Sequence, residues 1–143
     1  MFSAKQNKKV FIGKLGEELS GKYLSGNKKY LVLFKNIKTP YGEVDLFCFD
    51  KINKEGVFVE VKTMIDNMSK YSIIPEDHLN EYKINKMKKN ALYLSNGKFY
   101  KWCEHGWRIE AVSIKMPEFA ISEDFCKKND PLQFCEIRHY ENI

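Results

Sequence analysis

Two stretches of this chain decide its fold: Gly42-Glu43-Val44-Asp45-Leu46-Phe47-Cys48-Phe49 and, after a polar loop at 50–56, Val57-Phe58-Val59-Glu60-Val61-Lys62. Both are rich in branched and aromatic residues, which is typical of strands, and the loop is short enough to join them as an antiparallel hairpin. Apolar side chains occur at both alternating sets of positions, as they do in strands buried on both faces. The two stretches therefore predict a hairpin at the centre of a sheet.

Charged side chains interrupt this apolar hairpin. Strand alternation places Asp45 on one face, together with Glu43, Phe47 and Phe49, and leaves Val44, Leu46 and Cys48 on the other. Glu60 and Lys62 share a face of the second strand, ~6.6 Å apart. A buried carboxylate is costly unless a cation compensates it. Two such acids on neighbouring strands therefore require a positive partner.

Two kinds of partner fit this requirement. A divalent ion such as Mg²⁺ or Mn²⁺ prefers carboxylate oxygens and leaves positions for water and phosphate. Lys62 beside that ion would position or deprotonate a water, or stabilise negative charge, as metal-assisted phosphodiester hydrolysis requires. The alternative is a structural salt bridge of Lys62 with Asp45 or Glu60, the commoner meaning of an isolated Glu-x-Lys. The preceding Gly-Glu-Val-Asp arm favours the metal.

A third acid lies upstream. Residues 11–25 predict a helix, because Ile12, Leu15, Leu19 and Tyr23 recur at helical spacing and Gly26-Asn27 follows as a stop. On this helix Glu17 lies within a stripe of small residues, Gly13, Gly16, Ser20 and Gly21, that would let the backbone approach a sheet closely. Glu17 is then a further metal or water ligand near the sheet end. Its alternative role is that of an early-helix acid favoured by the helix dipole.

The rest of the chain completes a mixed α/β pattern. We expect a strand at 30–34, a turn at 39–42, a second helix from Pro75 to about Leu94, and strands at 108–114 and 134–140. Strands and helices mixed in this order predict a central mixed sheet flanked by helices.

Size and composition limit the classes of protein. The chain has 143 residues, about the size of one domain, so we expect a single domain over 1–143 with a basic tail at 1–10. No apolar run approaches the ~20 residues that cross a bilayer, and the start is not a secretory signal. Four scattered cysteines without a paired spacing fit reduced thiols and a cytoplasmic location. The net charge of +5 is compatible with a nucleic-acid partner.

At these residues the sequence resembles the YraN-like (UPF0102-type) family, a branch of the PD-(D/E)xK nuclease superfamily. Three segments carry the resemblance: Gly13-x-x-Gly16-Glu17-x-x-Ser20-x-x-Tyr23-Leu24, Asn36-x-Lys38-x-x-x-Gly42-Glu43-Val44-Asp45-Leu46, and Phe58-Val59-Glu60-Val61-Lys62-Thr63. The resemblance implies a restriction-endonuclease-like core similar to archaeal Holliday-junction resolvases. Where the family often has Arg after Lys-Thr, this chain has Met64.

The resemblance also implies roles for individual residues. Asp45, Glu60 and Lys62 match the superfamily's catalytic acids and lysine, and Glu17 matches the helix-borne acid of the resolvase-like branch. Asp45 and Glu60 would hold Mg²⁺ or Mn²⁺, with the carbonyl of Val61 and with Glu17 assisting. Glu43 would lie behind these ligands or on the phosphate side.

Two lysines indicate how a substrate would bind. Lys83 and Lys86 lie beside the inner face of the second helix, where they would guide a phosphate backbone, although such lysines also occur on plain solvated faces. The sequence favours a metal-dependent nuclease acting on DNA, with branched or junction DNA and a homodimer suggested by the resolvase likeness. The alternatives are a non-catalytic nucleic-acid-binding accessory protein and an RNA-directed enzyme.

Overall fold

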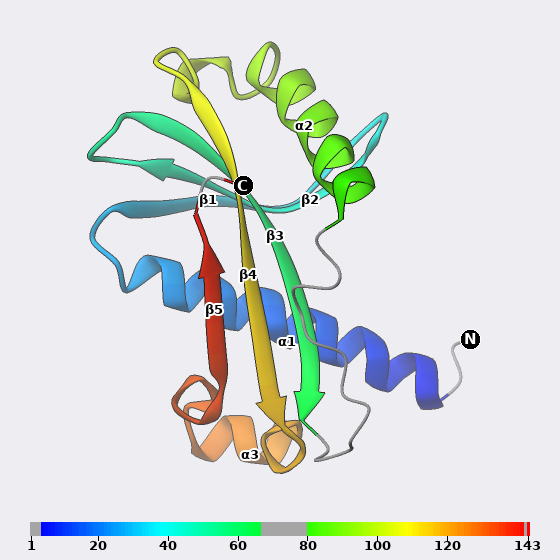
Figure 1. The fold of residues 1–143 in the computed structure, drawn as a ribbon. Helices are drawn as coiled ribbons and strands as arrows, with labels where there is room; N and C mark the ends of the chain where they lie inside the picture. Colours follow the sequence, from blue (N-terminus) through cyan, green and yellow to red (C-terminus); the bar gives the residue numbers. More distant parts are fainter. Residues whose placement is uncertain (1–3, 67–79, 142) are drawn as a thin grey trace.

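The computed structural model describes residues 4–66, 80–141 and 143. In chain order its main elements are α1 (Ala4–Ser25), β1 (Tyr30–Thr39), β2 (Gly42–Asp50), β3 (Glu55–Asp66), α2 (Glu81–Ser95), β4 (Trp107–Pro117), α3 (Glu123–Lys128) and β5 (Glu136–Tyr140). The described strands form a five-stranded sheet in the order β1-β2-β3-β4-β5 (Figure 1). Only the β3–β4 pair of this sheet is parallel. The predicted α/β class with a central mixed sheet is confirmed.

The two long helices cover opposite faces of the sheet (Figure 1). On one face, Leu15, Leu19 and Leu24 of α1 pack against the buried side chains of Leu46, Cys48, Val57 and Val59. On the other, Met87, Ala91 and Leu94 of α2 pack against a cluster that contains Phe47 and Phe58. Because side chains alternate between the two faces along β2 and β3, these strands contribute to two separate cores, as the apolar pattern on both faces of the hairpin predicted.

Helix boundaries follow local capping signals. The Asn80 side chain accepts a hydrogen bond from the backbone N–H of Lys83 at 2.9 Å, so α2 begins at Glu81. The predicted start of this helix at Pro75 lies outside the described residues. Helix α1 ends at Ser25 before Gly26-Asn27, as predicted, but it begins at Ala4. Residues 4–10, expected as a basic tail, therefore form the first turns of α1.

The predicted hairpin of β2 and β3 is confirmed, several strands are longer than predicted, and the strand predicted at 134–140 begins only at Glu136. β1 continues to Thr39, directly at the predicted turn, and β4 runs to Pro117. β2 and β3 pair antiparallel, but only from Leu46, opposite Val59, to Asp50, opposite Glu55. Before Leu46 the β1–β2 hairpin leaves the rest of the sheet and curves toward α2 (Figure 1). β2 and β3 thus diverge just where Asp45 lies.

One predicted facing is wrong at this fork. Val44 was expected on the same face as Leu46 and Cys48, but it packs in the α2-side cluster with Phe47. The register of β1 and β2 places Asn36 opposite Asp45, and Asn36 has a φ of 52° in the middle of its strand. Such a left-handed residue interrupts the regular pleat. The interruption explains why alternation fails between Val44 and Leu46.

None of the described helices is both long enough and apolar enough to cross a membrane.

Candidate active site

Asp45 is positioned by the divergence of β2 from β3. It directly precedes Leu46, the first β2 residue that pairs with β3. Its Oδ2 accepts a hydrogen bond from the backbone N–H of Val61 at 2.8 Å. The carboxylate of Asp45 thus accepts a hydrogen bond from a β3 backbone N–H that no longer pairs with β2. This contact fixes the carboxylate of Asp45 beside Glu60, the residue before Val61.

Burial raises the proton affinity of both acids. Burial and the neighbouring Glu60 raise the pKa of Asp45 to about 7. Burial likewise raises the pKa of Glu60, although Lys83, the hydrogen bond with Asp45 and Lys62 oppose the change. Two partly buried carboxylates this close cannot both be charged without cost unless a cation lies between or beside them. The pair therefore has the electrostatic character of a cation site.

Helix α1 brings Glu17 to the same place. Gly16 allows the close approach of α1 to β3, because a Cβ on Gly16 would lie 1.7 Å from the Thr63 Oγ1. Of the predicted small-residue stripe, Gly13 has open space around it and Gly21 has only ordinary contacts, so the approach depends on Gly16. Burial, with Asp45 next, raises the pKa of Glu17.

Asn36 is a site residue for which the sequence predicted no role. With its amide nitrogen facing the acids, Asn36 donates to Glu17 Oε2 at 2.9 Å and to Glu43 Oε1 at 3.2 Å. Asparagine is one of the few residues other than glycine that tolerates a positive φ. An asparagine between the strand-like residues 30–34 and the turn at 39–42 is the sequence signal that would have identified this strained position. Asn36 links Glu43 to the acid cluster through Glu17.

Lys62 lines the same cavity as the acids. Glu17, Asp45, Glu60 and Lys62 border a cavity of about 770 Å³, together with the backbone neighbours Val61 and Thr63 and the helix residues Lys8 and Lys9. Burial lowers the pKa of Lys62, and the positive charges of Lys83 and Lys9 lower it further. A lysine with a lowered pKa more easily exists as the neutral amine that can accept a proton.

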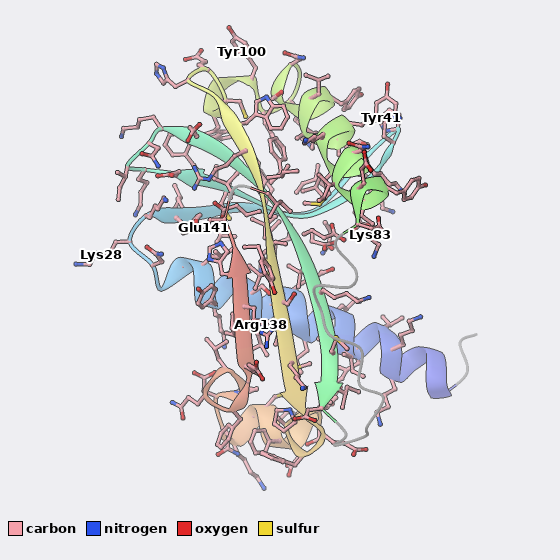
Figure 2. All side chains as sticks on the ribbon, in the orientation of Figure 1. Lys28, Tyr41, Lys83, Tyr100, Arg138 and Glu141 are labelled. Atoms are coloured by element: carbon pink, nitrogen blue, oxygen red, sulfur yellow. The ribbon has the colours of Figure 1, made fainter. Side chains whose placement is uncertain are left out.

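A second, smaller cavity opens from the acids toward α2. It has a volume of about 310 Å³ and is lined by Glu43, Asp45, Glu60, Tyr82, Lys83, Lys86, Met87 and Asn90. Figure 2 shows Lys83 at the start of α2 and Tyr41 at the β1–β2 turn beside the same helix. The predicted phosphate-guiding lysines therefore border the acid pair directly.

The acid cluster is more open than a closed metal cage. Among the described residues, the one group of three acids or histidines whose ligand atoms all lie within 4.8 Å of one another is Glu110, His139 and Glu141. That group could hold a metal ion by its geometry, but Glu110 already accepts hydrogen bonds from Tyr30 at 2.8 Å and from Arg108 at 2.7 Å. Burial raises the pKa of Glu110, but hydrogen bonds with His139 and Arg108 have the larger effect, so the pKa of Glu110 is lowered overall. Glu110 is therefore already paired with Arg108 and His139, whereas no ion pair among the described residues reaches Asp45 or Glu60.

The residues at the fork fit a hydrated divalent ion. Their donor set consists of carboxylate oxygens and a nearby carbonyl, the ligands that Mg²⁺ and Mn²⁺ prefer. A cavity beside them leaves room for water and for a phosphate. The fold and this cluster define an α/β protein with a central mixed sheet and a carboxylate–lysine site where two of its strands diverge.

Comparison with known proteins identifies the family. The sequence model of the "Uncharacterised protein family UPF0102" matches residues 16–114, and this chain belongs to that family. A UPF0102 protein of Thermodesulfovibrio yellowstonii is 38% identical over 134 residues, covering 94% of this chain and 96% of that protein. One of Fervidobacterium nodosum is 39% identical over 142 residues, covering 96% and 83%. The predicted family resemblance is confirmed.

One solved structure is a distant match. It is described as the structure of Pyrococcus furiosus SfsA in complex with Ca²⁺, and it is 14% identical with a TM-score of 0.37. The match covers 76% of this chain and 58% of that one.

Proposed function

We propose that this protein is a divalent-metal-dependent nuclease that hydrolyses phosphodiester bonds in DNA, with branched or junction DNA as its preferred substrate. The observation that carries the proposal is the meeting of Glu17, Asp45, Glu60 and Lys62, from one helix and two strands, around one cavity. Lysines border the acids on both sides: Lys9 toward α1, and Lys83 and Lys86 toward α2. This is the charge pattern that a phosphate backbone requires.

Each residue has a defined task in this proposal. Asp45, Glu60 and the carbonyl of Val61 would hold Mg²⁺ or Mn²⁺, with Glu17 assisting; when bound, the ion would polarise the scissile phosphate and acidify a water. Lys62 orients the attacking water and accepts its proton as the new P–O bond forms and the ester P–O bond breaks, and the leaving oxygen takes a proton from a second water. Asn36 holds Glu17 and Glu43 in place, and Glu43 lies on the phosphate side toward Lys83.

A preference for junctions is proposed together with a homodimer. A symmetric four-way junction presents two equivalent cleavage positions, and a two-fold dimer would present two equivalent sites.

One observation favours a second candidate, a nucleic-acid-binding accessory protein without turnover. No three of the acids at the fork, all of them described residues, bring ligand atoms within 4.8 Å of one another. A fold that keeps the basic surroundings and has lost tight metal coordination would bind DNA without cutting it.

Cleavage assays separate the two candidates. Purified protein is incubated with labelled junction, flap, single-stranded and duplex DNA in Mn²⁺, Mg²⁺ or EDTA. The proposal expects cutting that requires the metal and is abolished by Asp45→Asn and Lys62→Ala. Glu17→Gln and Glu18→Gln form a matched pair on α1, because Glu17 lines the cavity and Glu18 is exposed.

The outcomes are distinct. Reduced cutting by Glu17→Gln with normal cutting by Glu18→Gln supports the proposed site. DNA binding without products from the wild type, unchanged by Asp45→Asn and Lys62→Ala, overturns the nuclease and supports the accessory protein.

A further inference from the structure

A groove of exposed tyrosines and lysines adjoins the acid cluster on the α2 side. It has a volume of about 590 Å³ and is lined by Tyr41, Tyr82, Asn85, Lys86 and Lys89. We call this surface the tyrosine–lysine groove. It lies between the β1–β2 turn and the outer surface of α2, where Figure 2 labels Tyr41.

The lining tyrosines are not part of either core. Tyr82 is 74% exposed and Tyr41 is 52% exposed, whereas Ala91 and Leu94 on the same helix as Tyr82 are fully or nearly buried. Tyr93, 49% exposed, packs edge-on against Tyr41 with ring centroids 6.0 Å apart, which supports the Tyr41 ring at its position. Because folding does not bury them, these aromatic faces are available to a ligand.

Along α2, the two lysines of the groove lie between two tyrosines. Tyr82, Lys86, Lys89 and Tyr93 occur at helical spacings of four, three and four residues, so they form one stripe along α2. The opposite stripe of α2, with Met87, Ala91 and Leu94, packs on the sheet. Aromatic faces interleaved with cations are the surface that binds unpaired nucleotides, because bases stack on rings while lysines pair with phosphates.

The groove runs directly into the proposed cleavage site. Tyr82 and Lys86 line both the tyrosine–lysine groove and the smaller cavity that contains Asp45 and Glu60. The cavity on the α1 side has a different character: it carries Lys8 and Lys9, and its described lining residues include no aromatic ring. The two approaches to the acids therefore differ, with stacking surfaces on one side only among the described residues.

We propose that the tyrosine–lysine groove binds unpaired nucleotides of a DNA strand whose neighbouring phosphate lies at Asp45 and Glu60. This inference rests on the proposed nuclease function and specifies its substrate class: among branched DNAs, those with a single-stranded segment, such as a flap, beside the cleavage position. Tyr41 and Tyr82 supply stacking surfaces, and Lys86 and Lys89 pair with the backbone phosphates. The Asn85 amide is placed to meet a base edge, since it lines the same groove.

Binding measured without cleavage tests the groove. Fluorescence anisotropy in EDTA compares a labelled oligothymidylate with a duplex of the same length, using the full chain. Tyr82→Ala and Tyr41→Ala are each expected to weaken single-strand binding about tenfold, with duplex binding changed less than about twofold. Tyr82→Phe keeps the ring and should bind as the wild type does.

Matched controls separate the groove from general charge and exposure. Tyr100, 59% exposed, lies away from Tyr41 in Figure 2, and Tyr100→Ala should leave binding unchanged. Lys89→Ala should weaken single-strand binding, whereas Lys88→Ala, an exposed α2 lysine outside the groove lining, should have little effect. Circular dichroism confirms that each variant is folded.

The possible results decide between this inference and the proposed function. Equal losses on single strand and duplex, or no loss with Tyr82→Ala and Tyr41→Ala, overturn the groove even if the wild type cuts DNA. Selective loss of single-strand binding in both tyrosine variants supports the groove, even if the wild type cuts nothing and the nuclease proposal fails. If the wild type does not bind the oligothymidylate, the groove proposal is wrong.

Discussion

The backbone N–H of Val61 donates to the Oδ2 of Asp45 at 2.8 Å, so a side chain occupies the place where strand pairing between β2 and β3 has ended. This contact holds a carboxylate beside Glu60 at the cost of charge repulsion. Two neighbouring carboxylates at a partly buried position are an arrangement that most proteins avoid. The first prediction follows from this relationship.

Without a divalent ion, the protein should lose stability as the pH rises through the range where Asp45 ionises. An unfolded aspartate titrates near ~3.9, whereas burial and Glu60 raise the pKa of folded Asp45 to about 7. Between these values the folded state binds more protons, so the free energy of unfolding falls as the pH rises from about 4 to about 7. Asp45→Asn should reduce this fall by an amount on the order of 2 kcal/mol.

Urea unfolding in EDTA at pH 5 and pH 8 measures this effect. Asp124→Asn is the control, because its side chain is 79% exposed. Addition of Mn²⁺ at pH 8 should raise the Tm of the wild type and leave that of Asp45→Asn unchanged. If the free energy of unfolding depended equally on pH in the wild type and in Asp45→Asn, the pKa of Asp45 would not be raised in the folded protein.

Lys62 should act through its neutral amine. Burial and the charges of Lys83 and Lys9 lower its pKa, so cleavage by the wild type should rise with pH and level off below the ordinary lysine value. Lys62→Met and Lys62→Arg should both reduce the cleavage rate by about a hundredfold or more, because neither side chain accepts a proton. DNA binding should persist in Lys62→Arg. Near-normal cleavage by Lys62→Arg would instead show that Lys62 only stabilises negative charge. Lys88→Arg is the control for a lysine-to-arginine change outside the site and should cleave as the wild type does.

Gly16 should be required for the contact between α1 and β3. A Cβ at this position would lie 1.7 Å from the Thr63 Oγ1 and 2.8 Å from the Thr63 Cβ, so Gly16→Ala should destabilise the protein by about 1–3 kcal/mol. Thr63→Ala in the same chain should recover part of the loss. Gly13→Ala is the matched control, because nothing lies within 4 Å of its Cβ position. Thermal unfolding of the three variants would refute the contact if Gly16→Ala and Gly13→Ala behaved alike.

Arg108 should stabilise the fold independently of the site. It forms ion pairs with Asp50 at 2.8 Å and with Glu110 at 2.7 Å, and both carboxylates are fully buried. Arg108→Met removes the arginine shared by both carboxylates, leaving Lys29 near Asp50 and His139 near Glu110, and should cost about 3–5 kcal/mol in urea unfolding. Arg138→Met, at an arginine whose side chain is 49% exposed, should cost less than about 1 kcal/mol. Similar costs for the two variants would argue against a dominant role for the buried network.

Local sequence patterns predicted most of the fold. The hairpin of β2 and β3, the turn after Thr39 and the end of α1 before Gly26 each depend on signals within a few residues. The predicted boundaries were wrong where the signal was weak: the mostly polar residues 4–10 lack apolar periodicity, yet they extend α1. The facing of Val44 failed because alternation assumes a regular pleat, and the positive φ of Asn36 breaks it.

By itself, the sequence determined the chemistry available at the site: acids and a lysine on apolar strands, an acid on a helix with small residues, and a lysine-rich second helix. Only the tertiary structure decided that these groups share adjoining cavities, that Asn36 joins Glu17 to Glu43, and that exposed tyrosines continue the site along α2. Sequence periodicity indicates which face of its own helix or strand a residue occupies. Whether α1 and α2, which are distant in sequence, meet at the acids depends on how both cores pack around the point where β2 and β3 diverge.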